Sequence, residues 1–123
     1  MLFRSCDVRI AASAGQFAIT PAKFGISYPQ EDVHRLVALV GPGQAARLLF
    51  TGAPIDAEEA LRIGLADVTE DLSAAILAND PTSLATLKQS IRLGTRSSEA
   101  QDRAFDALFA SDTLAARLDE RRR

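Results

Sequence analysis

Apolar residues at helical spacing dominate the middle of the chain. Between residues 33 and 40 they recur at i, i+3, i+4 and i+7, which predicts a helix that begins near Asp32. The Gly-Pro-Gly sequence at residues 41–43 predicts a break after it. A second helix is expected over residues 44–50, with Ala45, Leu48 and Leu49 facing inward.

Two short apolar segments precede this helical region. Residues 8–12 and 16–19 are typical of strands, and Ser13, Ala14 and Gly15 between them are typical of a turn. The local pattern fits two alternatives, an ordinary hairpin and the last turn of a spiral of strands and helices. Pro21 and Pro29 favour extended backbone in the residue before each, so Tyr28 is expected in a non-helical conformation.

Capping residues mark a third helix after Thr51. Asp56 lies three residues before Glu59, a spacing in which Asp56 accepts from the helix N-terminus while Glu59 reaches back. This pattern predicts a helix over residues 57–63 that ends at Gly64. The two acids then need no catalytic explanation.

The C-terminal part is expected to be helical throughout. Residues 71–78 support a brief helix at most, whereas Asp80 and Pro81 are typical of a helix start whose apolar stripe runs to Gly94. Further helices are expected from Ser98 and around Leu114 and Leu118. The chain is therefore expected to be α+β and mostly helical.

Composition limits the possible classes of protein. The chain has 123 residues, of which 47% are hydrophobic, enough for one domain with a core but not for two. A net charge of -2 gives no general attraction to nucleic acid, and no apolar run approaches the roughly 18 residues of a membrane span. The single Cys cannot form an internal disulfide. A cytoplasmic protein that binds neither nucleic acid nor membrane is expected.

Two motifs carry a resemblance to a known family. TPAKFGISYP at residues 20–29 and LLFTGAPIDAEEALRIGL at residues 48–65 make the chain similar to the enoyl-CoA hydratase/isomerase family, also called the crotonase superfamily. The Tyr-containing loop is closest to methylmalonyl-CoA decarboxylase-like members. The resemblance implies that residues 1–69 form the last turn of a crotonase-like ββα spiral and that residues 70–123 form a C-terminal helical oligomerisation region. In the family, residues 1–5 would end a helix, and the N-terminal half of the fold would precede them.

Candidate chemistry gathers where the extended segment meets the first helix. Tyr28 either donates its hydroxyl to an acyl carboxylate or acts as an acid or base, or it packs under the loop as an ordinary amphipathic side chain. The resemblance supports a functional role, since a Tyr at the matching position is a functional residue in decarboxylase-like members. Glu31 is either a general acid or base or a solvated acid at a helix N-terminus. His34 lies on the polar face of the predicted helix, and without a second His or a nearby Cys a zinc site is not expected.

The resemblance also implies a nucleotide-binding role for the last helices. Arg121 matches a basic position that holds coenzyme A phosphates in the family, and Phe105 matches an aromatic residue near the adenine. A basic helix C-terminus also complements the helix dipole without any ligand. A coenzyme A thioester is then the substrate, and neither a cofactor nor a metal is expected.

Several catalytic groups of the family have no counterpart in this sequence. The resemblance places both backbone donors of the oxyanion site before the position of Met1, and it aligns the two glutamates of true hydratases with Met1 and Pro21. Two hypotheses remain: an acyl-CoA hydratase, isomerase or decarboxylase-like protein that is impaired alone, or a non-enzymatic oligomerisation module. Its partner would be a second copy, in a trimer-based assembly by resemblance, or a full-length relative.

Overall fold

The computed structural model describes residues 6–121, so the expected helix end at residues 1–5, together with Arg122 and Arg123, lies outside the described part. The chain divides into two compact units, residues 1–71 and 72–123, called here the N-terminal and C-terminal units. Each is described separately.

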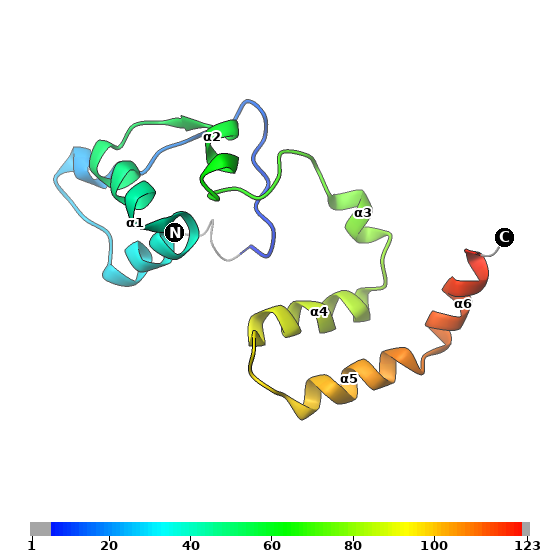
Figure 1. The fold of residues 1–123 in the computed structure, drawn as a ribbon. Coiled ribbons are helices and arrows are strands. Elements are labelled where there is room, and N and C mark those ends of the chain that lie inside the picture. Colours follow the sequence, from blue (N-terminus) through cyan, green and yellow to red (C-terminus); the bar gives the residue numbers. More distant parts are fainter. Residues whose placement is uncertain (1–5, 122–123) are drawn as a thin grey trace. The chain divides into compact units, whose positions relative to one another are not determined.

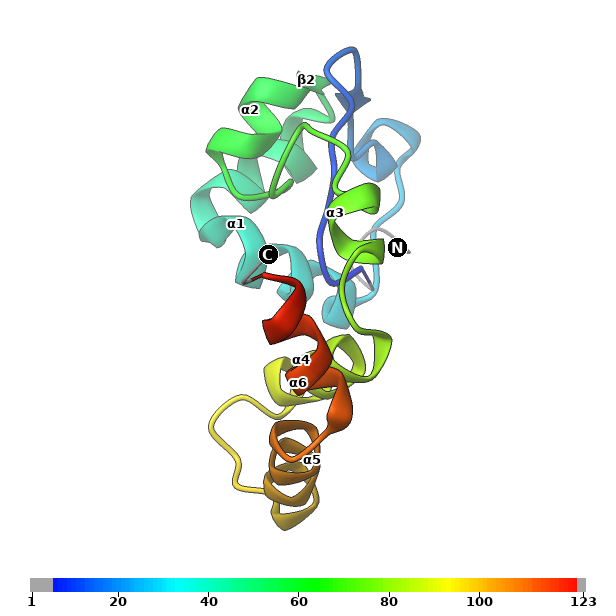
Figure 2. The ribbon, with the colours of Figure 1, turned by 90° about the vertical axis from the view of Figure 1, so that its right-hand side faces the viewer.

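The N-terminal unit combines one long helix with short elements (Figure 1). In chain order these are β1 (Gln16–Phe17), the 3-10 helix η2 (Pro21–Phe24), α1 (Gln30–Thr51), β2 (Ile55–Asp56) and α2 (Ala57–Arg62). Figure 2 shows β2 leading directly into α2.

The strand pairing differs from that of an ordinary hairpin. β1 pairs antiparallel with β2, with Gln16 opposite Asp56 and Phe17 opposite Ile55. The preceding segment pairs elsewhere, because Ile10 forms a parallel bridge with Val68. Of the two alternatives for this segment, the ordinary hairpin is therefore wrong.

An ion pair explains why the segment around Ile10 pairs with a distant partner. The Asp67 carboxylate accepts from the Arg9 backbone N–H at 2.8 Å and from its guanidinium at 2.7 Å. The Asp67 backbone N–H donates to the Arg9 carbonyl at 2.8 Å. The pattern of neighbouring residues in the sequence cannot indicate such contacts, because the two residues are far apart along the chain.

The predicted break between the first two helices is confirmed. α1 is continuous in outline, but Gly41 inside it has φ 80° and ψ 163°, and Pro42 follows. This conformation is accessible essentially only to glycine. α1 therefore consists of two helical arms joined by a kink.

The capping prediction for α2 is half right. The Asp56 carboxylate accepts from the Glu59 backbone N–H at 2.8 Å, as expected. The Glu59 side chain does not reach back, because its carboxylate accepts from Arg62 on α2 and Arg47 on α1. Glu59 thus links the two helices.

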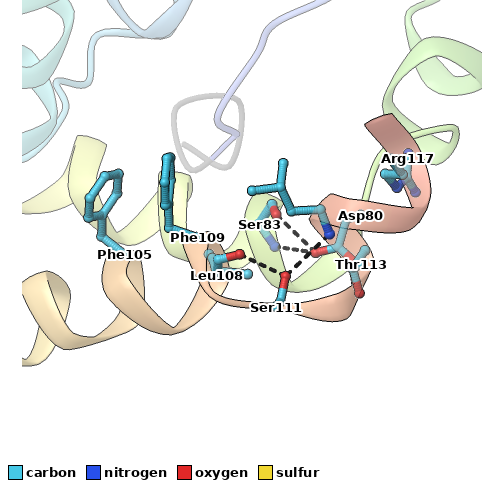
Figure 3. A pocket seen from close by; sticks show the side chains of 9 residues that line it. Asp80, Ser83, Phe105, Leu108, Phe109, Ser111, Thr113 and Arg117 are labelled. Carbon is cyan, nitrogen blue, oxygen red and sulfur yellow. Dashed lines mark hydrogen bonds between the residues drawn. The ribbon is translucent and has the colours of Figure 1, made fainter. Parts of the chain in front are cut away.

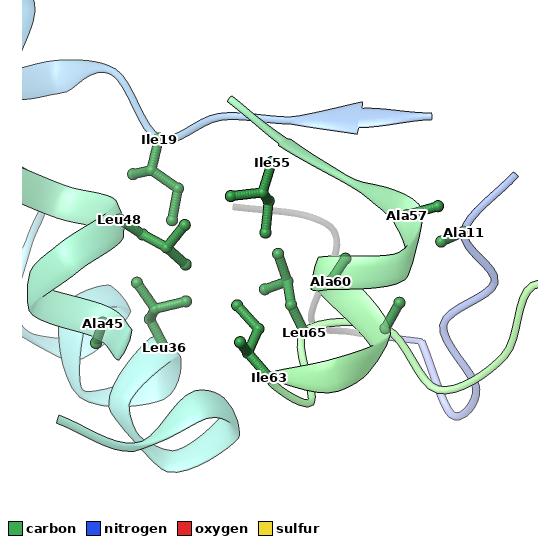
Figure 4. Close-up of a cluster of buried hydrophobic side chains, with 11 residues drawn as sticks. Ala11, Ile19, Leu36, Ala45, Leu48, Ile55, Ala57, Ala60, Ile63 and Leu65 are labelled. Carbon is green, nitrogen blue, oxygen red and sulfur yellow. The ribbon is translucent and has the colours of Figure 1, made fainter. Parts of the chain in front are cut away.

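The buried core of the described residues lies in the N-terminal unit. Figure 4 shows Ile19, Leu36, Leu48, Ile55, Ile63 and Leu65 converging from β1's continuation, both arms of α1, β2 and the end of α2. Buried alanines allow close approach of the backbone: Ala11, Ala45, Ala57, Ala60 and Ala66.

The C-terminal unit contains four helices: α3 (Ser73–Leu77), α4 (Pro81–Leu93), α5 (Glu99–Phe109) and α6 (Asp112–Glu120). The predicted start and end of α4 are confirmed, since Asp80 accepts from the Ser83 N–H and Gly94 follows the helix with φ 60°. α5 begins after Ser98, as expected, and Ser98 accepts from the Gln101 N–H. The Gln101 amide joins α5 to α4 by donating to the Thr86 carbonyl at 2.6 Å and to Ser90 Oγ at 2.7 Å. None of these four helices has a buried residue.

In the part of the chain that the structure describes, no helix is both long and apolar enough to cross a membrane.

Candidate functional site

Tyr28 lines an apolar cavity in the N-terminal unit. The cavity has a volume of about 310 Å³. Its lining comes from the β1 segment, the loop before α1, the second arm of α1 and the segment after α2: Gln16, Phe17, Ala18, Ile19, Tyr28, Leu48 and Leu65. Tyr28 is 38% exposed, so the residue is accessible from solvent.

Local hydrogen bonds hold the loop that carries Tyr28. On one side, Gly25 ends η2 with φ 69°, and the Ile26 N–H donates to the Pro21 carbonyl at 3.1 Å. On the other side, the Pro29 carbonyl accepts from the Asp32 N–H at 3.0 Å and so starts α1. Tyr28 is non-helical, as predicted. The residue before Pro21 departs from expectation, because Thr20 has ψ 7° where the chain turns into η2.

Glu31 and His34 lie outside this cavity. The Glu31 carboxylate forms an ion pair with Arg35, four residues along α1, and its side chain is 73% exposed. His34 is exposed on the same helix, as predicted from its polar face. The structure therefore brings Tyr28 together with apolar side chains and does not bring it together with either of these titratable groups.

A second cavity, of about 250 Å³, lies in the C-terminal unit (Figure 3). Phe105 and Phe109 of α5 form its aromatic end, with ring centroids 5.9 Å apart and planes tilted by 32°. Both residues are largely exposed, at 61% and 70%. Exposed aromatic faces of this kind can stack on a planar ligand.

The opposite end of the C-terminal cavity is polar. Asp80 accepts from the Ser83 N–H at 2.8 Å and from Ser83 Oγ at 3.0 Å. These bonds, together with the charge of Arg117, hold the pKa of Asp80 below its ordinary value. Arg117 lines the cavity and donates to the Ala78 carbonyl at 3.2 Å.

Arg121, the basic residue predicted from the resemblance, is placed differently from Arg117. Arg121 ends α6 and is exposed, one helical turn beyond Arg117, and it is not among the residues that line the cavity. The sequence did not indicate four further residues that line this cavity: Arg117, Ser83, Ser111 and Thr113. A signal existed for Ser83 and Ser111, which take part in helix capping, but capping alone does not indicate a cavity.

Among residues 6–121, no group of three or more His, Cys, Asp or Glu side chains is arranged to hold a metal ion.

Comparison with known proteins defines the class. A family model described as enoyl-CoA hydratase/isomerase matches residues 1–120. The chain therefore belongs to the enoyl-CoA hydratase/isomerase family, as its two motifs predicted.

The relatives of this chain are named for different activities. The chain is 31% identical to a short-chain-enoyl-CoA hydratase of Clostridium acetobutylicum, covering 96% of this chain and 52% of that protein. It is 30% identical to the methylmalonyl-CoA decarboxylase of Escherichia coli, covering 75% of this chain and 39% of that protein. The chain thus spans about half the length of the Clostridium relative.

Solved structures agree on the fold. An enoyl-CoA hydratase/isomerase family protein from Hyphomonas neptunium superposes with a TM-score of 0.73 at 33% identity, covering 95% of this chain and 52% of that one. An enoyl-CoA hydratase from Bacillus anthracis, 24% identical, superposes with a TM-score of 0.74 over 98% of this chain and 53% of that one. The predicted α+β, mostly helical, crotonase-like fold is confirmed.

Proposed function

We propose that this chain binds acyl thioesters of coenzyme A and takes part in their hydration, isomerisation or decarboxylation. The observation that carries the proposal is the family match over residues 1–120, together with the hydratase relative aligned over 96% of the chain. Each unit carries one cavity, and a role is proposed for each cavity by itself.

The cavity of the N-terminal unit is proposed to receive the acyl group. Its wall is apolar, while Gln16 and Tyr28 provide its hydrogen-bonding side chains. The Tyr28 hydroxyl can donate to an oxygen of the acyl group, and the resemblance implies an acyl carboxylate as its acceptor. That Glu31 acts as a general acid or base stays a prediction. Its ion pair with Arg35 gives it a structural role, because the pair stabilises the first turn of α1.

The C-terminal unit is proposed to bind the nucleotide end of coenzyme A. The exposed face of Phe105 offers stacking for a base, and the guanidinium of Arg121 offers paired donors to phosphate oxygens. Arg117 adds a second positive charge on the same helix.

Turnover by these 123 residues alone is proposed to be weak. The resemblance places both oxyanion donors at positions before Met1, and the loss of a single donor typically costs about a hundredfold or more in rate. Binding depends on the groups described above and is expected to survive.

Calorimetry against coenzyme A tests the proposal. The chain is expected to bind at low salt and to bind more weakly at moderate salt, because phosphate pairing is screened. Arg121→Ala should weaken binding. Arg103→Ala is the matched control, since it removes an equal charge from the exposed face of α5, where Arg103 pairs with Glu99 at 3.6 Å. Absence of binding at low salt would contradict the proposal.

A second candidate function is an oligomerisation module, as a homo-oligomer or with a longer relative. One observation favours it: α4 and α5 carry large apolar side chains that are exposed, namely Leu87, Ile91, Phe105 and Phe109. Surfaces of this kind are typical of interaction sites.

A further inference from the structure

α6 forms one wall of the C-terminal cavity and is attached to the rest of its unit at few points. The side chains that this helix contributes to the lining are Thr113, Leu114 and Arg117. Leu114 is half-buried, whereas the other residues of α6 are exposed. Because a short helix is held mainly by the packing of an apolar face, the position of α6 depends on Leu114 and on polar contacts.

Arg117 supplies a polar contact over a long stretch of sequence. Its guanidinium donates to the Ala78 carbonyl at 3.2 Å, and the two residues are 39 positions apart. Ala78 ends α3 and Asp80 precedes α4, so the guanidinium reaches the turn between these helices. The hydrogen bonds from Ser83, and then the positive charge of Arg117, lower the pKa of the Asp80 carboxyl. Figure 3 shows Arg117 and Asp80 at the polar end of the cavity.

The joint between α5 and α6 is short. Ala110 and Ser111 connect the two helices. Ser111 Oγ donates to the Leu108 carbonyl at 2.7 Å and accepts from the Leu114 N–H at 3.4 Å. Residues at the ends of helices are the ones that absorb changes in backbone torsion angles when a helix moves. α6 can therefore turn about this joint and keep the hydrogen bonds inside both helices.

α4 and α5 form the fixed side of the cavity. The Gln101 amide on α5 donates to the Thr86 carbonyl and to Ser90 Oγ on α4. These bonds hold the two helices together along their length. A displacement of α6 then opens the cavity and leaves the other two walls in place.

We propose that α6 is a hinged lid on the C-terminal cavity, latched by the contact of the Arg117 guanidinium with the Ala78 carbonyl and the Asp80 carboxylate. Release of the latch lets α6 turn about its joint with α5 and opens the cavity to solvent. Arg117 and Ala78 are exposed, and exposed charged contacts typically change an equilibrium by about two- to fivefold. The latch therefore yields without unfolding of α4 or α5. The lid belongs to the C-terminal unit and does not rest on the proposed function.

Double electron–electron resonance measures the position of α6 in the full chain. Nitroxide labels are attached through Gln89→Cys on α4 and Ala116→Cys on α6, both exposed positions, in a Cys6→Ser background. Labelled chain is diluted with unlabelled chain, so that labels in different copies do not contribute. A latched and an open distance are expected, and Arg117→Gln should raise the ratio of open to latched chains about two- to fivefold.

Arg121→Gln is the matched control for this measurement. It removes an equal charge from the end of the same helix, outside the lining of the cavity. The ratio of open to latched chains should stay at the wild-type value. A ratio that is unaltered in Arg117→Gln, or altered equally in both variants, would overturn the proposal.

Asp80→Asn separates the charge of the latch from helix capping. Asn caps a helix N-terminus about as well as Asp, so α4 keeps its start while the negative charge is removed. The open fraction should rise by less than in Arg117→Gln, because the Ala78 carbonyl still accepts from the guanidinium. With helicity verified by circular dichroism, an open fraction that does not rise would contradict the proposal.

Thiol labelling tests whether release of the latch opens the cavity. Ser83 is half-buried and lines the cavity, so Ser83→Cys in the Cys6→Ser background places a reactive group there. A water-soluble maleimide should react about two- to fivefold faster at this position when Arg117→Gln is added. Gln89→Cys, exposed on α4 outside the lining, should react at the same rate with and without Arg117→Gln. No acceleration at position 83, or equal acceleration at both positions, would overturn the lid.

Discussion

Leu48 and Phe50 lie two positions apart on the second arm of α1 and have opposite surroundings. Leu48 is 2% exposed in the core, whereas Phe50 is 81% exposed. Leu48→Ala should therefore lower the free energy of unfolding by about 2–5 kcal/mol, since it removes buried methyl groups and leaves a cavity. Phe50→Ala should change it by less than about 0.5 kcal/mol. Urea unfolding of both variants checks this, and equal losses would contradict the core assignment.

Individual site residues differed in how far the sequence could indicate them. Tyr28 was identifiable because prolines define its loop and the family motif contains it. Arg117 was not, because its part in the C-terminal cavity depends on the packing of α6 near Asp80 and Phe105. The spacing of residues in the sequence predicts which of them share one face of a helix. Which residues that face contacts depends on the tertiary structure.

At the level of elements, the kink in α1 depends on one glycine. Gly41 has φ 80° and ψ 163°, whereas Gly43 lies in helical conformation, and a Cβ at either position would have open space around it. Gly41→Ala should destabilise the fold by about 1–3 kcal/mol through backbone strain alone. Gly43→Ala should stabilise it by up to about 1 kcal/mol, because the unfolded chain loses freedom. Denaturation midpoints that move in the same direction would contradict this assignment.

The link between α1 and α2 should make stability depend on pH. Hydrogen bonds from Arg62, with a further contribution from Arg47, lower the pKa of Glu59 from 4.5 to about 2. Because the folded state favours the charged carboxylate, this stabilisation is complete above pH 4.5 and is lost as the pH falls towards 2. Urea midpoints of the wild type and Glu59→Gln should therefore differ most near neutral pH and converge at low pH. A constant difference would contradict the prediction.

Helices were predictable from sequence to a greater degree than strand pairing. Asp80, Gly94 and Ser98 act on backbone groups within a few residues, so their sequence positions suffice to locate helix ends. β1 pairs with a segment nearly forty residues away, and loop length alone gives no indication of that partner. The hairpin alternative failed for this reason.

At the scale of the whole molecule, the two units differ in how much they bury. Every buried hydrophobic residue among those described lies in the N-terminal unit. The helices of the C-terminal unit leave Leu87 and Ile91 exposed on α4. Isolated short helices are marginal in water, so we expect this unit to pack against a further surface.

Assembly is therefore expected in solution. Light scattering at micromolar concentration should give a mass above that of a single chain, and Ile91→Asp should reduce it while far-UV circular dichroism keeps its helical signal. Gln89→Asp, at an exposed polar position of α4, is the matched control. A monomeric mass with cooperative unfolding would contradict the prediction.

The central claim, that this family member binds an acyl thioester of coenzyme A, is tested most directly by an assigned ¹H–¹⁵N NMR titration with butyryl-CoA. The account predicts saturable amide shifts at residues 16–19, 28, 48 and 65 in the N-terminal unit, and around residues 105 and 117–121 in the C-terminal unit. Free coenzyme A should reproduce the second set of shifts and leave the first set largely absent. A spectrum unchanged at saturating ligand, or shifts confined to other residues, would contradict the account.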